Sequence, residues 1–90
     1  MAREETLPSR NERVVARRSG ETVFLLDPIS GEYFTLDDVG GRIWELCDGT
    51  RTAGDIAEVL AAEYDAPAEK ILHDVIALLD DLARSELVVR

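Results

Sequence analysis

Residues 23–50 read VFLLDPISGEYFTLDDVGGRIWELCDGT, and this stretch decides the fold. Thr22–Leu26 and Tyr33–Leu36 are rich in β-branched and large apolar residues, as is typical of paired strands. Pro28 presets one turn dihedral and Gly31 permits a positive one, so the chain turns back between the two strands. The pattern predicts two antiparallel strands followed directly by a helix.

A third strand is expected upstream of this stretch. Val14–Val15 read as a short strand, and Ser19–Gly20 supply a tight turn into the next one, which completes a three-stranded meander. Residues 1–12 are polar and charged without periodicity, so they are predicted to form a flexible tail. Residues 13–90 are then a single small domain.

Three helices are predicted after the sheet. Asp or Thr residues stand at the start of the first two as caps, and a capping-box pattern links Thr52 to Asp55. Proline fits the first position of the third helix. The predicted helices run from Asp37 or Asp38 to Asp48–Gly49, from Thr52 to Tyr64 and from Pro67 to about Ser85. Leu87–Val89 is expected to return against the sheet.

The predicted fold class is α+β, with a three-stranded antiparallel sheet followed by three helices. This order resembles a winged helix-turn-helix whose wing has moved to the front, and that shape commonly binds DNA. A winged-helix DNA-binding regulator is therefore one alternative. The third helix, however, has only Lys70 and Arg84 against four acidic residues, and the second helix has no Lys or Arg. These charges argue against reading DNA.

The chain is strongly acidic, with a net charge of -9. Residues 1–18 hold five arginines and three glutamates, whereas the remainder holds five basic and sixteen acidic residues. Such a surface repels phosphate backbones, so a cationic or apolar partner is expected and nucleic acid is not.

The single cysteine, Cys47, excludes an internal disulfide and indicates a reducing compartment, which predicts a cytoplasmic protein. The longest unbroken run of large aliphatic or aromatic residues, Val23–Leu26, is too short to span a bilayer. Neither Cys47 nor His73 has an evident third partner for nucleophilic catalysis, and the acidic residues match no metal-binding pattern. The sequence therefore predicts no catalytic residue, no metal and no cofactor, with a small enzyme using Cys47 as the least favoured alternative.

The third helix is apolar over an arc of roughly 160°, whereas a helix lying on one core needs about 100°. One interpretation is that this helix is the central element of the core. The other is that Ile71 and Leu78, with Val75 and Leu82 behind them, line an open groove edged by Asp74 and Asp81.

The strand Tyr33–Leu36 is predicted to lie at the edge of the sheet. It lacks the Lys, Pro or bulge that usually protects an exposed edge. Either the tail or a neighbouring molecule covers this edge, or an extended peptide adds a fourth strand there. Such an edge can also pair with the same edge of a second copy, so the sequence leaves the oligomeric state open.

The chain resembles the PqqD-like family, whose members are called RiPP recognition elements. The resemblance covers roughly residues 14–89. It is carried by LLDPISGEYFTLDDVG (25–40), IWEL (43–46) and DGTRT (48–52), with Ile56, Leu60, Asp74, Val75, Leu79 and Leu82. The strand segment SGEYFTL (30–36) looks most like the stand-alone members of lasso-peptide pathways. Ser85–Glu86 and Cys47 depart from the usual family pattern, which puts the pathway in question.

The resemblance implies a non-catalytic domain that binds the leader segment of a ribosomally made precursor peptide. The leader is laid as an extra strand on the third strand, against the third helix, and is presented to tailoring enzymes, here a leader peptidase. A peptide chaperone of pyrroloquinoline quinone biosynthesis is the alternative within the family. The implied peptide-binding residues are Glu32, Tyr33, Phe34, Thr35, Leu36, Ile71, Asp74, Val75, Leu78, Asp81 and Leu82.

Overall fold

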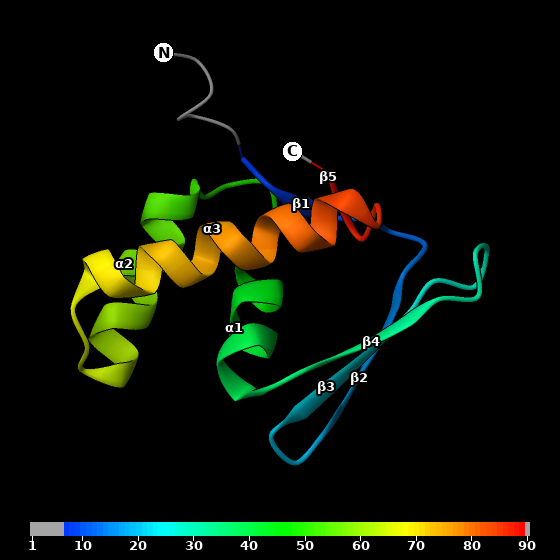
Figure 1. The fold of residues 1–90 in the computed structure, drawn as a ribbon, viewed down its shortest axis with the longest axis horizontal. Helices are drawn as coiled ribbons and strands as arrows, with labels where there is room; N and C mark the ends of the chain where they lie inside the picture. The colour runs from blue at the N-terminus through cyan, green and yellow to red at the C-terminus, as the bar shows by residue number, and fades with distance from the viewer. Residues whose placement is uncertain (1–6, 90) are drawn as a thin grey trace.

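The computed structural model describes residues 7–89. Its elements form a three-stranded antiparallel sheet, three helices and a separate pair of two-residue strands, so the predicted fold class is confirmed (Figure 1). In chain order the elements are β1 (Ser9–Arg10), β2 (Val15–Ser19), β3 (Thr22–Leu26), β4 (Tyr33–Leu36), α1 (Asp38–Leu46), α2 (Ala53–Tyr64), α3 (Ala68–Arg84) and β5 (Val88–Val89).

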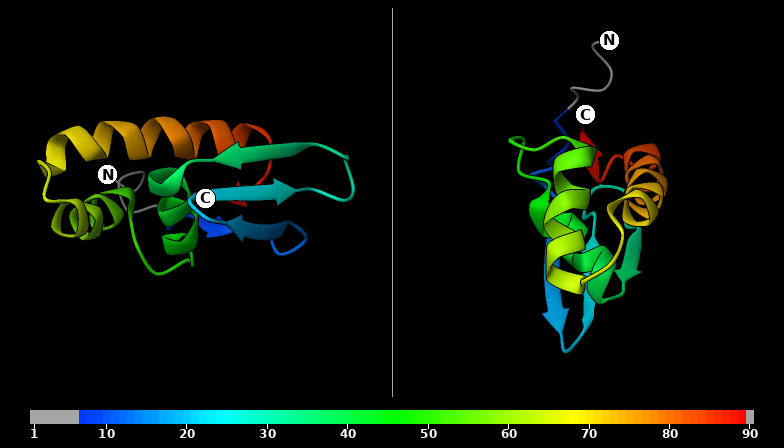
Figure 2. Two further views of the ribbon diagram at one scale, coloured as in Figure 1. Left: turned by 90° about the horizontal axis from the view of Figure 1, so that it is seen from below. Right: turned by 90° about the vertical axis from the view of Figure 1, so that its left-hand side faces the viewer.

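The sheet has the order β2-β3-β4, so β4 is an edge strand, as predicted. Val23 is paired with Leu36, and Leu26 with Tyr33. Seen from below, α3, β4, β3 and β2 follow one another across the molecule (Figure 2). The free edge of the sheet therefore lies on the side of α3.

The first two helices begin at the capping residues that the sequence indicated. The Asp37 carboxylate accepts a hydrogen bond from the Gly40 N–H at 2.7 Å. Thr52 and Asp55 form the reciprocal capping box, with bonds of 3.0 and 3.1 Å. Asp65 ends α2 in the left-handed conformation, with φ of 53°. These local bonds satisfy backbone groups that a helix end otherwise leaves open.

The core lies between one face of the sheet and the helices. Val23, Leu25 and Leu36 point inward from the sheet, and each helix adds buried aliphatic side chains. α1 approaches β3 closely because Gly41 has no side chain: a Cβ there would lie 2.5 Å from Val23 Cγ2. Glycine at this position thus sets the distance between helix and sheet.

Two sequence-based expectations about the chain ends were wrong. Ser9–Arg10 is not part of a flexible tail, because it forms β1 and pairs with β5. Correspondingly, β5 pairs with β1 and not with the three-stranded sheet. The cause is long-range bonding that composition does not reveal: the Arg10 guanidinium donates to the Glu45 carbonyl, 35 residues along the chain, at 2.6 Å. Residues 1–6 of the expected tail lie outside the described part of the chain.

An ion pair between an exposed arginine and a buried aspartate ties the start of the sheet to the β3–β4 turn. The Arg13 guanidinium donates to both Asp27 carboxylate oxygens, at 3.0 and 2.8 Å, and Asp27 is only 1% exposed. Arg13 also reaches Glu86 at 3.4 Å, just before β5. The Arg13 hydrogen bonds lower the pKa of the Asp27 carboxyl to about 2, with help from the Ile29 and Ser30 amides.

Replacing Gly41 with Ala is expected to destabilise the fold by about 1–3 kcal/mol, because the new methyl group overlaps Val23. The matched control is Gly54→Ala, in the first turn of α2. There a Cβ meets only Thr52 Oγ1 at 3.7 Å, so a gain of about 0.5–1 kcal/mol is expected. Urea unfolding of both variants measures the difference. Equal effects of the two substitutions would contradict the close helix–sheet contact.

Asp27→Asn is expected to change how stability depends on pH. The folded pKa of about 2 lies below the ordinary 3.8, so the stabilisation is complete above about pH 4 and is lost as the pH falls toward 2. The variant lacks this stabilisation at neutral pH, and its free energy of unfolding falls less steeply as the pH is lowered. The midpoints of urea unfolding at pH 7, 4 and 2 measure this change in pH dependence. Arg13→Gln should have the same effect without adding to that of Asp27→Asn; a wild-type pH profile in either variant would refute the assignment.

Candidate functional site

At the open edge of β4, two residues direct their backbone N–H and C=O groups away from the sheet. The Asp27 N–H donates to the Glu32 carbonyl at 2.9 Å, which marks residues 27 and 32 as a hydrogen-bonded pair. Alternation along an antiparallel ladder then directs the N–H and C=O groups of Phe34 and Leu36 toward β3. The backbone groups of Tyr33 and Thr35 therefore point out of the sheet, where no described strand pairs with them.

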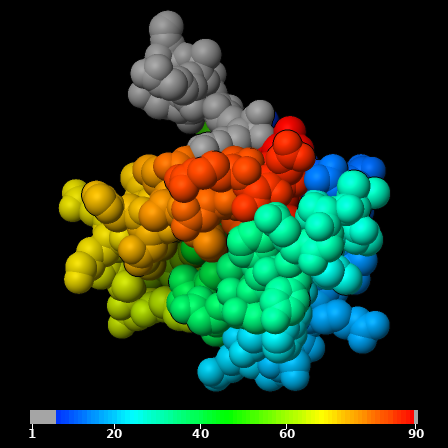
Figure 3. Space-filling model, turned by 45° about the vertical axis from the view of Figure 1, so that its right-hand side comes forward, coloured from blue at the N-terminus to red at the C-terminus, as the bar shows by residue number. Residues whose placement is uncertain are grey.

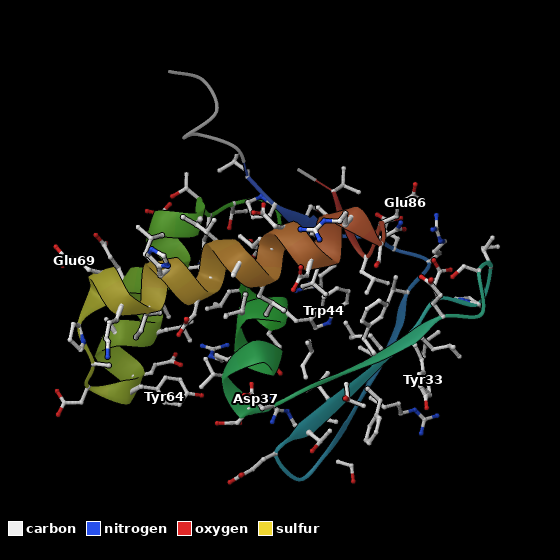
Figure 4. All side chains as sticks on the ribbon, in the orientation of Figure 1. Tyr33, Asp37, Trp44, Tyr64, Glu69 and Glu86 are labelled. Atoms are coloured by element: carbon white, nitrogen blue, oxygen red, sulfur yellow. The ribbon has the colours of Figure 1, made fainter. Side chains whose placement is uncertain are left out.

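The side chains of β4 alternate between the two faces of the sheet. Leu36 is buried and Phe34 is half-buried against the core, so both lie on the face that the helices cover. Tyr33 is 72% exposed and points away from α3 (Figure 4). The predicted site residues Tyr33 and Phe34 thus lie on opposite faces, and only Phe34 shares a face with the third helix.

The apolar arc of α3 divides into a buried part and an accessible part. Val75 and Leu82 are 0% and 1% exposed and belong to the core. Ile71 and Leu78 are half-buried and pack against that core. The centre of the wide arc is therefore core, and both of its margins are half-buried: Ile71 and Leu78 on one side, Leu72 and Ala83 on the other.

A hollow lies where α3 borders β4 and α1. Figure 3 shows these segments on one face of the molecule, with the surface recessed between the middle of α3 and the green segment of β4 and α1. Each of the three elements carries half-buried apolar side chains that pack against the core. These are Phe34 from β4, Val39 from α1, and Ile71, Leu72, Leu78 and Ala83 from α3.

The predicted acidic rim residues of α3 differ in their surroundings. Asp74 and Asp81 are both exposed. Asp81 lies 3.6 Å from Arg84, one turn along the helix, so its charge is partly neutralised. Asp74 has no ion-pair partner among residues 7–89. Asp74 is therefore the more available of the two for a cationic ligand.

The side chains considered for catalysis do not form a reactive group. Cys47 is fully buried, its thiol donates to the Ile43 carbonyl at 3.2 Å, and burial raises its pKa to about 11. Such a thiol is neutral at pH 7 and is not a nucleophile. His73 is exposed on α3. Within residues 7–89 no three His, Cys, Asp or Glu side chains gather in a way that suits a metal ion.

One cavity, of about 330 Å³, lies elsewhere in the molecule. It is bordered by residues 9–12, by Val14 and Ala16, and by Trp44, Cys47 and Asp48, and it involves neither β4 nor α3. Sequence reasoning missed it because its walls depend on β1, which was expected to be flexible. Among the described helices, none has the length and apolarity that a bilayer crossing requires.

The chain is similar in sequence to proteins named PqqA binding protein. The PqqA binding protein of Bradyrhizobium diazoefficiens is 51% identical over 47 residues, or 52% of this chain and 46% of that protein. The PqqA binding protein of Xanthomonas euvesicatoria pv. vesicatoria is 45% identical over 53 residues, or 59% and 58% of the two chains. This chain thus spans about half the length of the curated relatives it matches.

Solved structures share its fold over most of their length. TbiB1 in complex with the TbiA(beta) leader peptide has a TM-score of 0.79 at 32% identity, covering 89% of this chain and 93% of that one. The PqqD truncation of Methylobacterium extorquens PqqCD, described as a RiPP recognition element, has a TM-score of 0.77 at 30% identity, covering 92% and 88%.

The family profile of coenzyme PQQ synthesis protein D (PqqD) matches residues 22–88. This match runs from the start of β3 into β5, and it includes the open edge of β4 and all three helices. It agrees with the shared fold of TbiB1 and the PqqD truncation. The chain therefore belongs to the PqqD family.

Proposed function

We propose that this chain binds the leader segment of a ribosomally made precursor peptide as a fourth strand on β4, against α3, and delivers it to a leader peptidase of a lasso-peptide pathway. The observation that carries the proposal is the open β4 edge beside the half-buried apolar residues of α3, among them Ile71 and Leu78. TbiB1, which shares the fold at 32% identity, is described in complex with a leader peptide.

Strand addition uses the backbone of β4. An antiparallel peptide would exchange hydrogen bonds with the outward N–H and C=O groups of Tyr33 and Thr35, which are the free groups of this edge. Such bonds give affinity without reading sequence. The role of Glu32–Leu36 is thus mainly that of a backbone template.

Specificity would come from the side chains that surround the added strand. Alternate leader residues would point toward Phe34, Ile71 and Leu78, whose half-buried faces offer apolar contact. Val75 and Leu82 would support these contacts from the core, which is the place the structure gives them. Asp74 and Asp81 would meet basic leader residues at the rim.

The role proposed for the chain is binding without catalysis, since the relatives are named as binding proteins and recognition elements. A second candidate ligand is a PqqA-type peptide, because a PqqA binding protein is 51% identical over 47 residues. Isothermal titration with a synthetic lasso leader and with PqqA separates the two. The peptide bound more tightly identifies the pathway.

Thr35→Pro is expected to weaken leader binding at least about tenfold while the fold survives, because proline removes an N–H that faces solvent and not β3. The matched control is Ala16→Pro on β2. Register places the Ala16 N–H on the opposite free edge of the same sheet, so this variant should bind normally. Titration calorimetry and circular dichroism measure both. Undiminished affinity in Thr35→Pro would rule out strand addition on β4.

Asp74→Asn is expected to reduce affinity for a basic leader about two- to fivefold and to weaken its salt dependence, as is typical of exposed ion pairs. Asp81→Asn should have the smaller effect, because Arg84 already lies 3.6 Å from its carboxylate. Affinities at 50 and 500 mM NaCl test this order. A larger loss in Asp81→Asn would show that the rim is assigned wrongly.

A further inference from the structure

The face of the sheet that points away from the helices carries a cluster of large apolar side chains. Register places Val15, Leu26 and Tyr33 in one cross-strand row, with Phe24 in the next. Their exposed fractions are 48%, 42%, 72% and 44% in that order. Apolar side chains gathered on one exposed face mark an interaction surface. This outer face comprises residues 15, 17, 19, 22, 24, 26, 33 and 35.

Arg17 is the only charged side chain among these eight positions. It is paired in register with Phe24, and it has no ion-pair partner within the described residues. The outer face therefore suits a partner whose apolar surface carries a carboxylate. A second copy of the chain fits poorly, because its outer face offers no acidic group to Arg17 and each copy has a net charge of -9.

β4 connects the outer face with the proposed peptide site. Tyr33 and Thr35 direct their side chains to the outer face and their backbone groups to the open edge. A peptide strand added to β4 would extend each cross-strand row by one residue, so that its outward side chains join the same surface. Occupants of the two sites would lie side by side without competing.

We propose that the outer face docks the enzyme that receives the leader, and that this enzyme contacts Val15, Phe24 and Leu26 together with the outward side chains of the bound peptide. The inference rests on the proposed function. It assigns the enzyme an apolar surface with a carboxylate opposite Arg17. It also predicts that the leader strengthens binding of the enzyme.

The test measures the affinity of this chain for a purified leader peptidase of a lasso-peptide pathway, with and without a synthetic leader peptide. The double variant Phe24→Thr and Leu26→Thr should bind the enzyme at least about tenfold more weakly, yet bind the leader within about twofold of wild type. Arg17→Glu should weaken enzyme binding, and Arg17→Lys should restore most of it. The control Ile76→Gln removes a side chain on α3 that is 45% exposed, and it should change neither affinity.

Wild-type enzyme affinity in the double variant and in Arg17→Glu would overturn the proposal. So would a wild-type dimer, seen by sedimentation, that these substitutions convert to monomer. If the double variant fails to fold, the enzyme affinity of Arg17→Glu alone tests the proposal, because this substitution changes one exposed side chain and should leave the fold intact. If the wild-type chain does not bind the leader, the proposed function is wrong. The affinity for the enzyme measured without peptide still shows whether the enzyme binds the outer face.

Discussion

The rest of the structure depends on the close contact between α1 and the sheet at Gly41. Because a Cβ at this position would lie 2.5 Å from Val23 Cγ2, only glycine lets the helix sit at its observed distance. α1 in turn contacts β3, β4, α2 and α3. A helix held further from the sheet would shift α3 relative to β4, and those two elements border the candidate site. One missing methyl group thus sets the geometry of the proposed binding surface.

The two edges of the small sheet differ in how well they are protected against pairing with another chain. At the β2 edge, Arg18 reaches Asp38 at 3.3 Å and Glu45 at 3.2 Å, so this strand is tied to α1 by charge. Arginine side chains on an edge strand also discourage pairing with another chain. Between Tyr33 and Leu36, β4 has no charged residue and no proline. In the proposed function, this unprotected edge and the neighbouring apolar face of α3 receive an extended, basic peptide.

Features specified by neighbouring residues could be predicted from the sequence. The capping box at Thr52, the turn at Gly31 and the limits of α3 all have local signals, and the structure confirms them. The pairing of β1 with β5 could not be predicted, because it joins two-residue segments from opposite ends of the chain. Neither segment is long enough to show a strand pattern.

The candidate site was predictable in its elements but not in the orientation of every side chain. The edge strand and the helix margin followed from composition and periodicity. Whether Tyr33 or Phe34 faces α3 depends on the strand register, and a shift of one residue reverses the answer. The ladder places Phe34 inward and Tyr33 outward. Likewise, only packing distinguishes Val75 and Leu82, which are core, from Ile71 and Leu78, which remain accessible.

Amide hydrogen exchange, followed by NMR with and without saturating leader peptide, tests the central claim most directly. Strand addition to β4 predicts that the amides of Tyr33 and Thr35 become strongly protected, because they alone in this strand point out of the sheet. The amides of Ala16 and Arg18, at the opposite edge, should exchange as before. Protection that appears at Ala16 and Arg18 while Tyr33 and Thr35 stay unchanged would contradict the account.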